Sequence, residues 1–259
     1  VHFHVLVVEW FGHPPAHEGL TAYGLIQFHE MKKVFGGVED DVMNRTRNWL
    51  LSRKNGKGGY QQQTGKYGFS GASAEVTNAY ITYALSETGT NDVLSEYRNA
   101  YAAATKSSDM YQLALVANTA FNLDQQEDYA TLIKLFKDQV LKNGYENLLA
   151  KHSLVWSGGH SLQTETYALW TLALLKATEP DLDLINGCIR KLIAGRQYGQ
   201  FGSTQATALS LQALTQYATL VRRIRTDGDI HLYLNNVVAD KLTYKKDSKD
   251  KLILQNFVQ

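Results

Sequence analysis

The sequence predicts an all-α protein, an α/α toroid of alternating inner and outer helices that ends in a short, truncated β segment. Three observations lead to this fold class. From His17 to about Leu220, the residues Ala, Leu, Tyr and Thr recur at the three- and four-residue spacing of helices. The expected helices alternate between apolar on all sides and amphipathic. Glycine-aromatic corners, such as Lys57–Tyr60 and Arg196–Gly202, follow outer helices where the chain must turn back.

Nine helices are expected, separated by glycines and by clusters of Asp and Asn. Ser73, Asp109 and Ser203 stand directly before helical patterns and are predicted N-caps. The three prolines all fall between helices, at Pro14, Pro15 and Pro180. The expected ranges are His17–Val34, Asp40–Lys54, Glu75–Thr88, Asp92–Thr105, Met110–Leu123, Glu127–Lys142, Gln163–Ala177, Leu182–Gly195 and Thr204–Leu220.

The helices fall into two kinds, and their order predicts the architecture. A helix that is apolar all round is buried on several sides, whereas an amphipathic helix covers a core with one face. The first kind includes residues 20–26, 79–85, 113–117 and 167–175, and the second includes residues 40–51 and 129–137. Inner and outer helices in alternation form a ring or solenoid of helix pairs. The uneven spacing of the pairs favours a closed toroid over a linear array.

After Leu220 the pattern changes, and a second domain is expected over residues 221–259. Val221–Arg225 is a basic linker and Asp227–Asp229 is a predicted turn. Short apolar or alternating runs follow, which predict strands at Ile230–Leu234, Lys241–Tyr244 and Leu252–Leu254. Because a few strands are not stable without partners, we expect these strands to pack on the ring or to be disordered.

Composition and charge exclude several classes of function. Of the 259 residues, 26 are Lys or Arg and 25 are Asp or Glu, so a net charge of +1 gives no global case for nucleic-acid binding. No apolar run approaches the roughly 18 residues of a membrane span. The single cysteine, Cys188, excludes an internal disulfide framework and a zinc site built from cysteines.

Three carboxylates at the expected starts of inner helices are the candidates for acid–base chemistry. Glu18, Glu75 and Glu165 would face the mouth of the ring, where a glycosidase or cyclase places such groups. Gln205 occupies the equivalent place in another repeat, and an amide cannot act as a general acid. We therefore expect these carboxylates to cap helices and to complement helix dipoles.

Other candidate motifs also favour structural roles. His13 and His17 are separated by two prolines, which forbid the helical turn of a paired metal site, so capping or surface roles are expected. Asn55–Gly59 follows a helix instead of a strand and is predicted to be a corner turn, not a phosphate loop. Asp181–Asp183 is expected to complement a helix dipole, and Cys188 to be a small buried apolar residue. We predict no catalytic set, no metal site and no cofactor.

One segment resembles a known family. Residues 196–209, with their Gly-Ser-Thr-Gln motif, are similar to the thioester-containing domain of the α2-macroglobulin and complement family. Residues 17–25, 47–60, 75–85 and 165–175 also fit, and the resemblance covers about residues 10–220. Residues 227–259 resemble the start of the CUB-like β-sandwich that follows this domain. The residues matching the family's helix starts are Glu18, Thr21, Glu75, Thr77, Glu165, Thr166, Ser203, Thr204 and Gln205.

The resemblance implies an extracytoplasmic, non-enzymatic defence protein with an α/α toroid. Such proteins are broad-spectrum endopeptidase inhibitors that trap proteases, or proteins that tag surfaces. Their thioester joins a Cys and a Gln in a Gly-Cys-x-Glu-Gln motif, and it acylates amines or hydroxyls once exposed. Neighbouring domains of the same parent chain keep it dry until then. The implied partners are those domains together with target proteases or surfaces; nucleic acid and a membrane span are not expected.

The sequence departs from the family in two places. It has no Cys-x-Glu-Gln, and Cys188 is followed by Ile189, so the chain is expected to be a fragment that lacks the thioester and cannot itself acylate. In relatives the motif precedes the region where this chain starts, so in this protein it was either cut off or never present. The loop expected to face the thioester contains Tyr60, Gln61, Tyr67 and Phe69 and no histidine between Gln61 and Phe69. Some complement relatives carry an acyl-accepting histidine there, so its absence implies direct reaction with amines.

Two further expectations concern origin and alternative functions. The lack of disulfides and the single glycosylation sequon at Asn44 look more like a bacterial macroglobulin than a vertebrate one, which implies the periplasm or cell envelope. The main alternative is a toroid enzyme of the terpenoid cyclase or prenyltransferase type. Such enzymes need an Asp-x-Asp-Asp acid or an Asp/Cys/His zinc set, and the sequence has neither pattern. A helical scaffold that binds protein through the ring face is the third alternative.

Overall fold

The computed structural model describes residues 16–62, 72–197, 199–221 and 227–246. The chain forms two compact units, Val1–Ala213 and Leu214–Gln259, and each is described by itself. The division falls inside the last helix. The first unit contains the helical body, and the second contains the end of that helix and a β-hairpin.

The described residues contain nine α-helices, as expected. Their ends agree with the predicted ranges to within two residues, except that α7 begins at Gly159, four residues before the predicted start at Gln163. A short 3-10 turn, η2 (Tyr145–Asn147), was not predicted. The helices are α1 (Glu18–Val34), α2 (Asp40–Ser52), α3 (Ala74–Glu87), α4 (Leu94–Ser107), α5 (Met110–Asn122), α6 (Gln126–Asn143), α7 (Gly159–Leu175), α8 (Leu182–Ala194) and α9 (Thr204–Val221).

Side-chain caps account for several helix starts. The predicted caps are confirmed: the Ser73 hydroxyl accepts a hydrogen bond from the Val76 amide (3.3 Å), and the Ser203 hydroxyl accepts one from Ala206 (3.1 Å). The Asp109 carboxylate accepts hydrogen bonds from the backbone amides of Tyr111 (3.0 Å) and Gln112 (3.1 Å) in the first turn of α5. Each cap satisfies an amide that the helix itself leaves unpaired.

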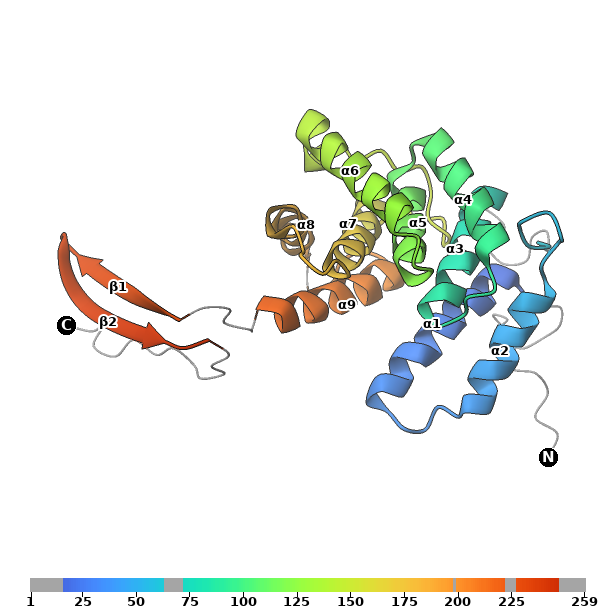
Figure 1. Ribbon diagram of the computed structural model, residues 1–259, viewed down its shortest axis with the longest axis horizontal. Coiled ribbons are helices and arrows are strands. Elements are labelled where there is room, and N and C mark those ends of the chain that lie inside the picture. Colours follow the sequence, from blue (N-terminus) through green and yellow to red (C-terminus); the bar gives the residue numbers. More distant parts are fainter. Residues whose placement is uncertain (1–15, 63–71, 198, 222–226, 247–259) are drawn as a thin grey trace. The chain divides into compact units, whose positions relative to one another are not determined.

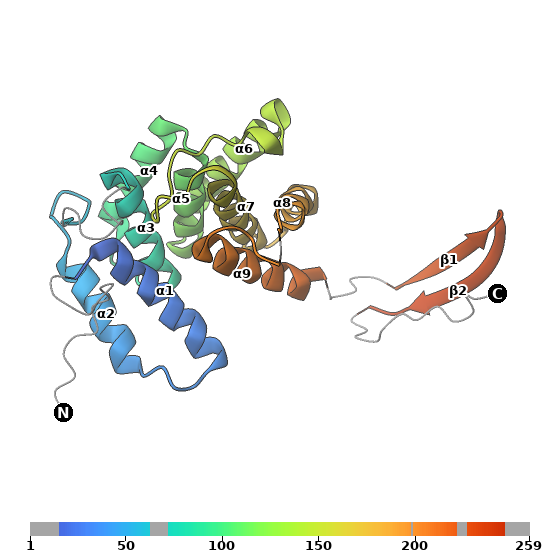
Figure 2. The same ribbon diagram turned by 180° about the vertical axis from the view of Figure 1, so that it is seen from behind.

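The alternation of inner and outer helices is confirmed, and the first unit is an α/α toroid. Helices α1, α3, α5 and α7 pack side by side in that order, and Figures 1 and 2 show α3, α5 and α7 in the middle of the helical unit. Eleven of the thirteen residues of α5 are buried, against three of the eighteen in α6. Phe136 of α6 stacks on the fully buried Trp170 of α7, with ring centres 4.2 Å apart. Outer helices thus cover the core with one face only.

Two inner helices differ from expectation. The predicted start of α7 was too late because Gly158 and Gly159 looked like a break, whereas Gly159 is the first helical residue and has a φ of +52°. Helix α9 is an inner helix only in its first half. Its buried residues all lie before Leu214, namely Gln205, Ala206, Leu209, Ser210 and Ala213.

The second unit contains an antiparallel hairpin of β1 (Gly228–Leu234) and β2 (Val237–Tyr244). The predicted turn at Asp227–Asp229 is wrong, because Gly228 pairs with Tyr244 inside the sheet. The turn is instead formed by Asn235 and Asn236, whose φ angles of 49° and 64° are the left-handed conformation of tight hairpin turns. The strand expected at Leu252–Leu254 lies outside the described residues. The CUB-like sandwich stays a prediction.

Candidate functional site

Glu165 lies at the centre of a buried polar site. It is the seventh residue of α7 and has no exposed surface. The Ser157 hydroxyl donates to its Oε1 atom at 2.6 Å, and the Ser203 hydroxyl donates to the same atom at 3.1 Å. Its Oε2 atom has no hydrogen-bond partner among the described residues. Burial raises the pKa of Glu165 to about 7, and the hydroxyls of Ser157, Ser203 and Ser153 only partly oppose this shift.

The charge of this carboxyl group acts on one tyrosine from each of three further inner helices, two of them fully buried and one half-buried. Tyr80 of α3 and Tyr111 of α5 are fully buried. The Gln205 amide of α9 approaches the Tyr80 hydroxyl (3.4 Å), and the Leu154 amide approaches that of Tyr111 (3.4 Å). Burial raises the pKa of both tyrosines, and the Glu165 charge raises them further. The same two causes raise the pKa of Tyr23 of α1, in the same order.

Five inner helices therefore contribute to one site, which we name the central polar cluster. Its residues are Tyr23, Tyr80, Tyr111, Ser157, Glu165, Ser203 and Gln205. Glu165 is its only carboxylate among the described residues, so the cluster lacks the paired carboxylates that glycoside hydrolysis uses. The arrangement ties the loop before α7 and the start of α9 to one buried acid.

The predicted helix-start carboxylates do not share one role. The capping prediction is wrong for Glu165, because α7 begins six residues earlier. Glu18 is buried and forms an ion pair with Arg53 (Nε to Oε1, 2.9 Å), while the cap of α1 is His17, whose side chain accepts from the Leu20 amide. Glu75 lies exposed in the first turn of α3, where it complements the helix dipole as expected.

The remaining family-motif residues divide by burial. Thr21, Thr77 and Thr166 are buried, and Thr204 is exposed. The Thr166 hydroxyl donates to the Leu162 carbonyl of its own helix (2.8 Å). The Thr21 hydroxyl has no partner among the described residues. The structure thus brings together only Glu165, Ser203 and Gln205 from the predicted set.

The loop predicted to face a thioester is described only in its first part. Tyr60 is buried, and its amide donates to the Asn78 side chain (3.1 Å). Gln61 is exposed, and its amide donates to the Arg53 carbonyl (2.8 Å). Tyr67 and Phe69 lie outside the described residues. The preceding corner turn is confirmed, with Gly56 and Gly58 both at positive φ.

Sequence reasoning missed Ser157 and the three tyrosines of the central polar cluster. Tyr23, Tyr80 and Tyr111 lie within apolar helical patterns, where an aromatic residue predicts core packing only. Ser157 lies in a loop between Trp156 and two glycines. The sequence offers one signal for Ser157: the small residues Ser157, Gly158 and Gly159 stand at the start of a buried helix, and small residues let a loop approach such a helix closely.

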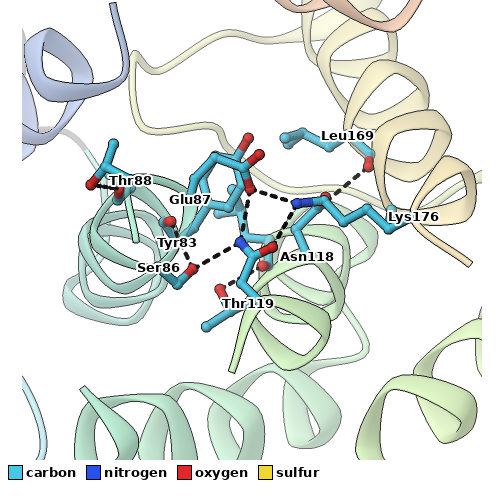
Figure 3. A network of polar contacts seen from close by, with 12 residues as sticks. Tyr83, Ser86, Glu87, Thr88, Asn118, Thr119, Leu169 and Lys176 are labelled. Carbon is cyan, nitrogen blue, oxygen red and sulfur yellow. Dashed lines mark hydrogen bonds and ion pairs between the residues drawn. The ribbon is translucent and has the colours of Figure 1, made fainter. Parts of the chain in front are cut away.

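A second polar network lies at the opposite, C-terminal ends of the inner helices, and Figure 3 shows Lys176 reaching across to Glu87. The Lys176 ammonium is 2.7 Å from both the Glu87 carboxylate and the Asn122 side-chain oxygen. The Asn122 amide donates to Glu87 (2.8 Å). Burial alone would raise the pKa of Glu87, but Lys176 and Asn122 outweigh it and hold the pKa below its usual value. The network joins α3, α5 and the end of α7.

The cysteine and the metal-ligating residue types were the other candidates for chemistry. Cys188 is fully buried, and burial raises the pKa of its thiol to about 12, so the expected packing role is confirmed. In the described part of the chain, no three His, Cys, Asp or Glu side chains lie close enough to bind a metal ion. Within the same part, no helix is both long and apolar enough to cross a membrane.

An α/α toroid whose Gly-Ser-Thr-Gln segment packs onto a buried acid is the class of domain that the fold and the central polar cluster define. Comparison with protein families identifies it: the family described as the A-macroglobulin TED domain matches residues 9–217. The chain belongs to this family, and the resemblance drawn from the sequence is confirmed.

Among curated proteins, the chain is similar to cobra venom factor of Naja kaouthia (27% identity, 86% of this chain, 14% of that protein). It is also similar to ovostatin of Gallus gallus (27%, covering 91% and 17%) and to Ophiophagus venom factor of Ophiophagus hannah (29%, covering 90% and 15%). The chain thus spans about a sixth of the length of these relatives. All three come from animals, so they give no support to the expected bacterial origin.

Proposed function

We propose that this chain is the thioester-containing domain of a larger, extracellular macroglobulin-like protein that traps endopeptidases or tags surfaces. The observation that carries the proposal is the family match over residues 9–217, which extends into all nine helices of the toroid. The domain's part is non-catalytic. It supplies a rigid helical body against which neighbouring domains of the parent protein pack, and its partners are those domains and the captured protease or surface.

In relatives the thioester motif lies before the region that corresponds to residue 1. When an amine reacts with such a thioester, its nitrogen attacks the carbonyl carbon, an amide forms, and the cysteine sulfur leaves as a thiolate. Residues 61–69 contain no histidine that could first take the acyl group. We therefore propose direct transfer to amines, above all to lysines of the captured protease.

The first test is to read the parent sequence upstream of Val1 and to treat the intact parent protein with trypsin. A Gly-Cys-x-Glu-Gln motif and trypsin adducts that survive denaturing electrophoresis are expected. The adducts should resist hydroxylamine, because amides resist it and esters do not. Pretreatment with methylamine, which consumes the thioester, is the matched control and should abolish them.

Two results would contradict the proposal in different ways. Mostly hydroxylamine-labile adducts would overturn transfer to amines but leave the trapping function intact. An upstream sequence without the motif, combined with no retention of trypsin by the native protein, would overturn the trapping function itself.

A further inference from the structure

A cavity separate from the central polar cluster lies between α3, α4, α5 and the loop before α7. Its volume is about 590 Å³, which is within the range of small-ligand pockets. We name it the side groove. The residues that line it are Ser73, Glu75, Val76, Ala103, Lys106, Ser107, Gln112, Lys151 and His152.

The floor of the side groove carries an amide side chain. Gln112 is only 6% exposed overall, and its side chain lines the groove. An amide offers one acceptor and two donor hydrogens, so it can pair with both sides of a peptide group. Gln112 thus presents a peptide-like partner inside a cavity.

The walls carry two ammonium groups. Lys106 and Lys151 both line the groove, and both are exposed to solvent. The backbone of Lys151 is held in place, because its amide donates to the Asp109 carboxylate that also caps α5 (2.8 Å). The Met110 amide holds the same loop through the Leu149 carbonyl (2.8 Å). Two placed cations favour a carboxylate ligand.

The loop before α7 completes the groove through His152. The ring of His152 stacks on Trp156, with ring centres 3.9 Å apart and planes within 7° of parallel. This stack orients the imidazole at the wall of the groove.

We propose that the side groove binds a peptide segment that carries an acidic side chain. Lys106 and Lys151 pair with the carboxylate, and Gln112 pairs with a neighbouring peptide group. The carboxylate of Glu75 lines the same cavity beside the two lysines, so the groove favours a ligand with a single negative charge over a phosphate-rich chain such as nucleic acid. The proposal rests on the geometry of the groove alone and does not depend on thioester chemistry.

The test is titration of the chain with the blocked tripeptide acetyl-Gly-Glu-Gly-amide, followed by nitrogen–proton NMR. Saturable shifts are expected for the side-chain amide of Gln112 and for the backbone amides of residues 106–107 and 151–152. The glutamine analogue of the tripeptide should bind at least about tenfold more weakly, because charge-assisted hydrogen bonds are roughly twice as strong as neutral ones. Inorganic phosphate, as a parallel probe, should bind more weakly than the tripeptide.

Two double variants distinguish binding in the groove from nonspecific attraction to positive charge on the protein surface. K106Q/K151Q should lower the affinity for the tripeptide by about tenfold without changing the melting temperature, because both side chains are exposed. The matched control K134Q/K142Q removes the same charge from two exposed lysines of α6 and should leave the affinity unchanged. A third variant, Gln112→Met, keeps the side-chain volume and should weaken binding in a chain that still melts cooperatively.

The outcomes are decisive either way. Equal binding of the glutamate and glutamine tripeptides, equal losses in the two lysine pairs, or tighter binding of phosphate would each overturn the proposal. Selective shifts at the groove that disappear in K106Q/K151Q and persist in K134Q/K142Q would support it.

Discussion

The Glu165 carboxyl group is an ionisable group in a place that water does not reach. The Ser157 and Ser203 hydroxyls both donate to its Oε1 atom, and nearby hydroxyls offset only part of the cost of ionising a group without access to water. A buried carboxyl group therefore keeps its proton to higher pH than it would in water, and the pKa of Glu165 rises to about 7 from its ordinary value of 4.5. Folding stability must then depend on pH through this one residue.

The sign of that dependence follows from proton binding. Between pH 4.5 and about 7 the folded chain holds a proton on Glu165 that the unfolded chain releases. The free energy of unfolding should fall across this window by about 3 kcal/mol relative to Glu165→Gln, which keeps the shape and cannot ionise. Urea denaturation of both proteins at pH 4.5, 6, 7 and 8 measures the difference. Glu75→Gln, at an exposed carboxylate, is the control: it keeps Glu165 and should therefore retain the slope of the parent chain.

At the scale of helices, the network of Glu87, Asn122 and Lys176 fastens the C-terminal ends of α3, α5 and α7 (Figure 3). The side chains of Glu87 and Lys176 are only 15% and 16% exposed. Their ion pair must offset the cost of removing both charges from water. Removing one partner therefore leaves the other charge buried and uncompensated.

Glu87→Ala should lower the free energy of unfolding by about 3 kcal/mol, because the Lys176 ammonium would lose its counter-ion inside the protein. Chemical denaturation at neutral pH measures this loss. The matched control is Asp41→Ala, which breaks an ion pair with Arg45 on the surface of α2, where Asp41 is 67% exposed. Surface pairs contribute little, so the control should cost less than about 1 kcal/mol. Similar losses in the two variants would show that the network is no stronger than a surface pair.

At the scale of the whole molecule, stability should be distributed unevenly between the units. Helix α5 is buried over eleven of its thirteen residues, whereas no residue of β1 or β2 is buried. Two strands alone are marginally stable, because they bury too little apolar surface to offset their ordering entropy.

Hydrogen exchange of the intact chain should follow this difference. Amides of α5 and α7 should exchange only on global unfolding, those of the outer helices α4 and α6 earlier, and those of β1 and β2 first. Exchange measured by mass spectrometry over minutes to hours separates these classes. Protection of the hairpin equal to that of α5 would contradict the prediction and would show that further chain covers the strands.

Much of this architecture follows from the sequence because the deciding interactions are local. Helix periodicity, the N-caps Ser73, Asp109 and Ser203, and the glycine corners depend on neighbours a few residues away, and each was predicted. The inner and outer helices were also separable, because burial on all sides requires apolar residues on all sides. The start of α7 and the position of the hairpin turn were predicted wrongly. Gly158 and Gly159 are typical of a helix break, and Asp227–Asp229 is typical of a turn, but Gly159 is helical and Gly228 lies in a strand.

The sites were decided by the tertiary structure. Glu18, Glu75 and Glu165 look equivalent in the sequence, yet one pairs with Arg53, one faces solvent, and one is buried beneath Ser157 and Ser203. The three glutamates differ in how deeply each is buried and in which distant segment contacts it. Neither property can be inferred from the residues next to each glutamate in the sequence. The same holds for Gln112, Lys106 and Lys151, which the fold gathers from two helices and a loop into one groove. Local sequence determined the helices and the family, and long-range packing determined the chemistry of each polar side chain, because burial and pairing depend on residues far apart in the chain.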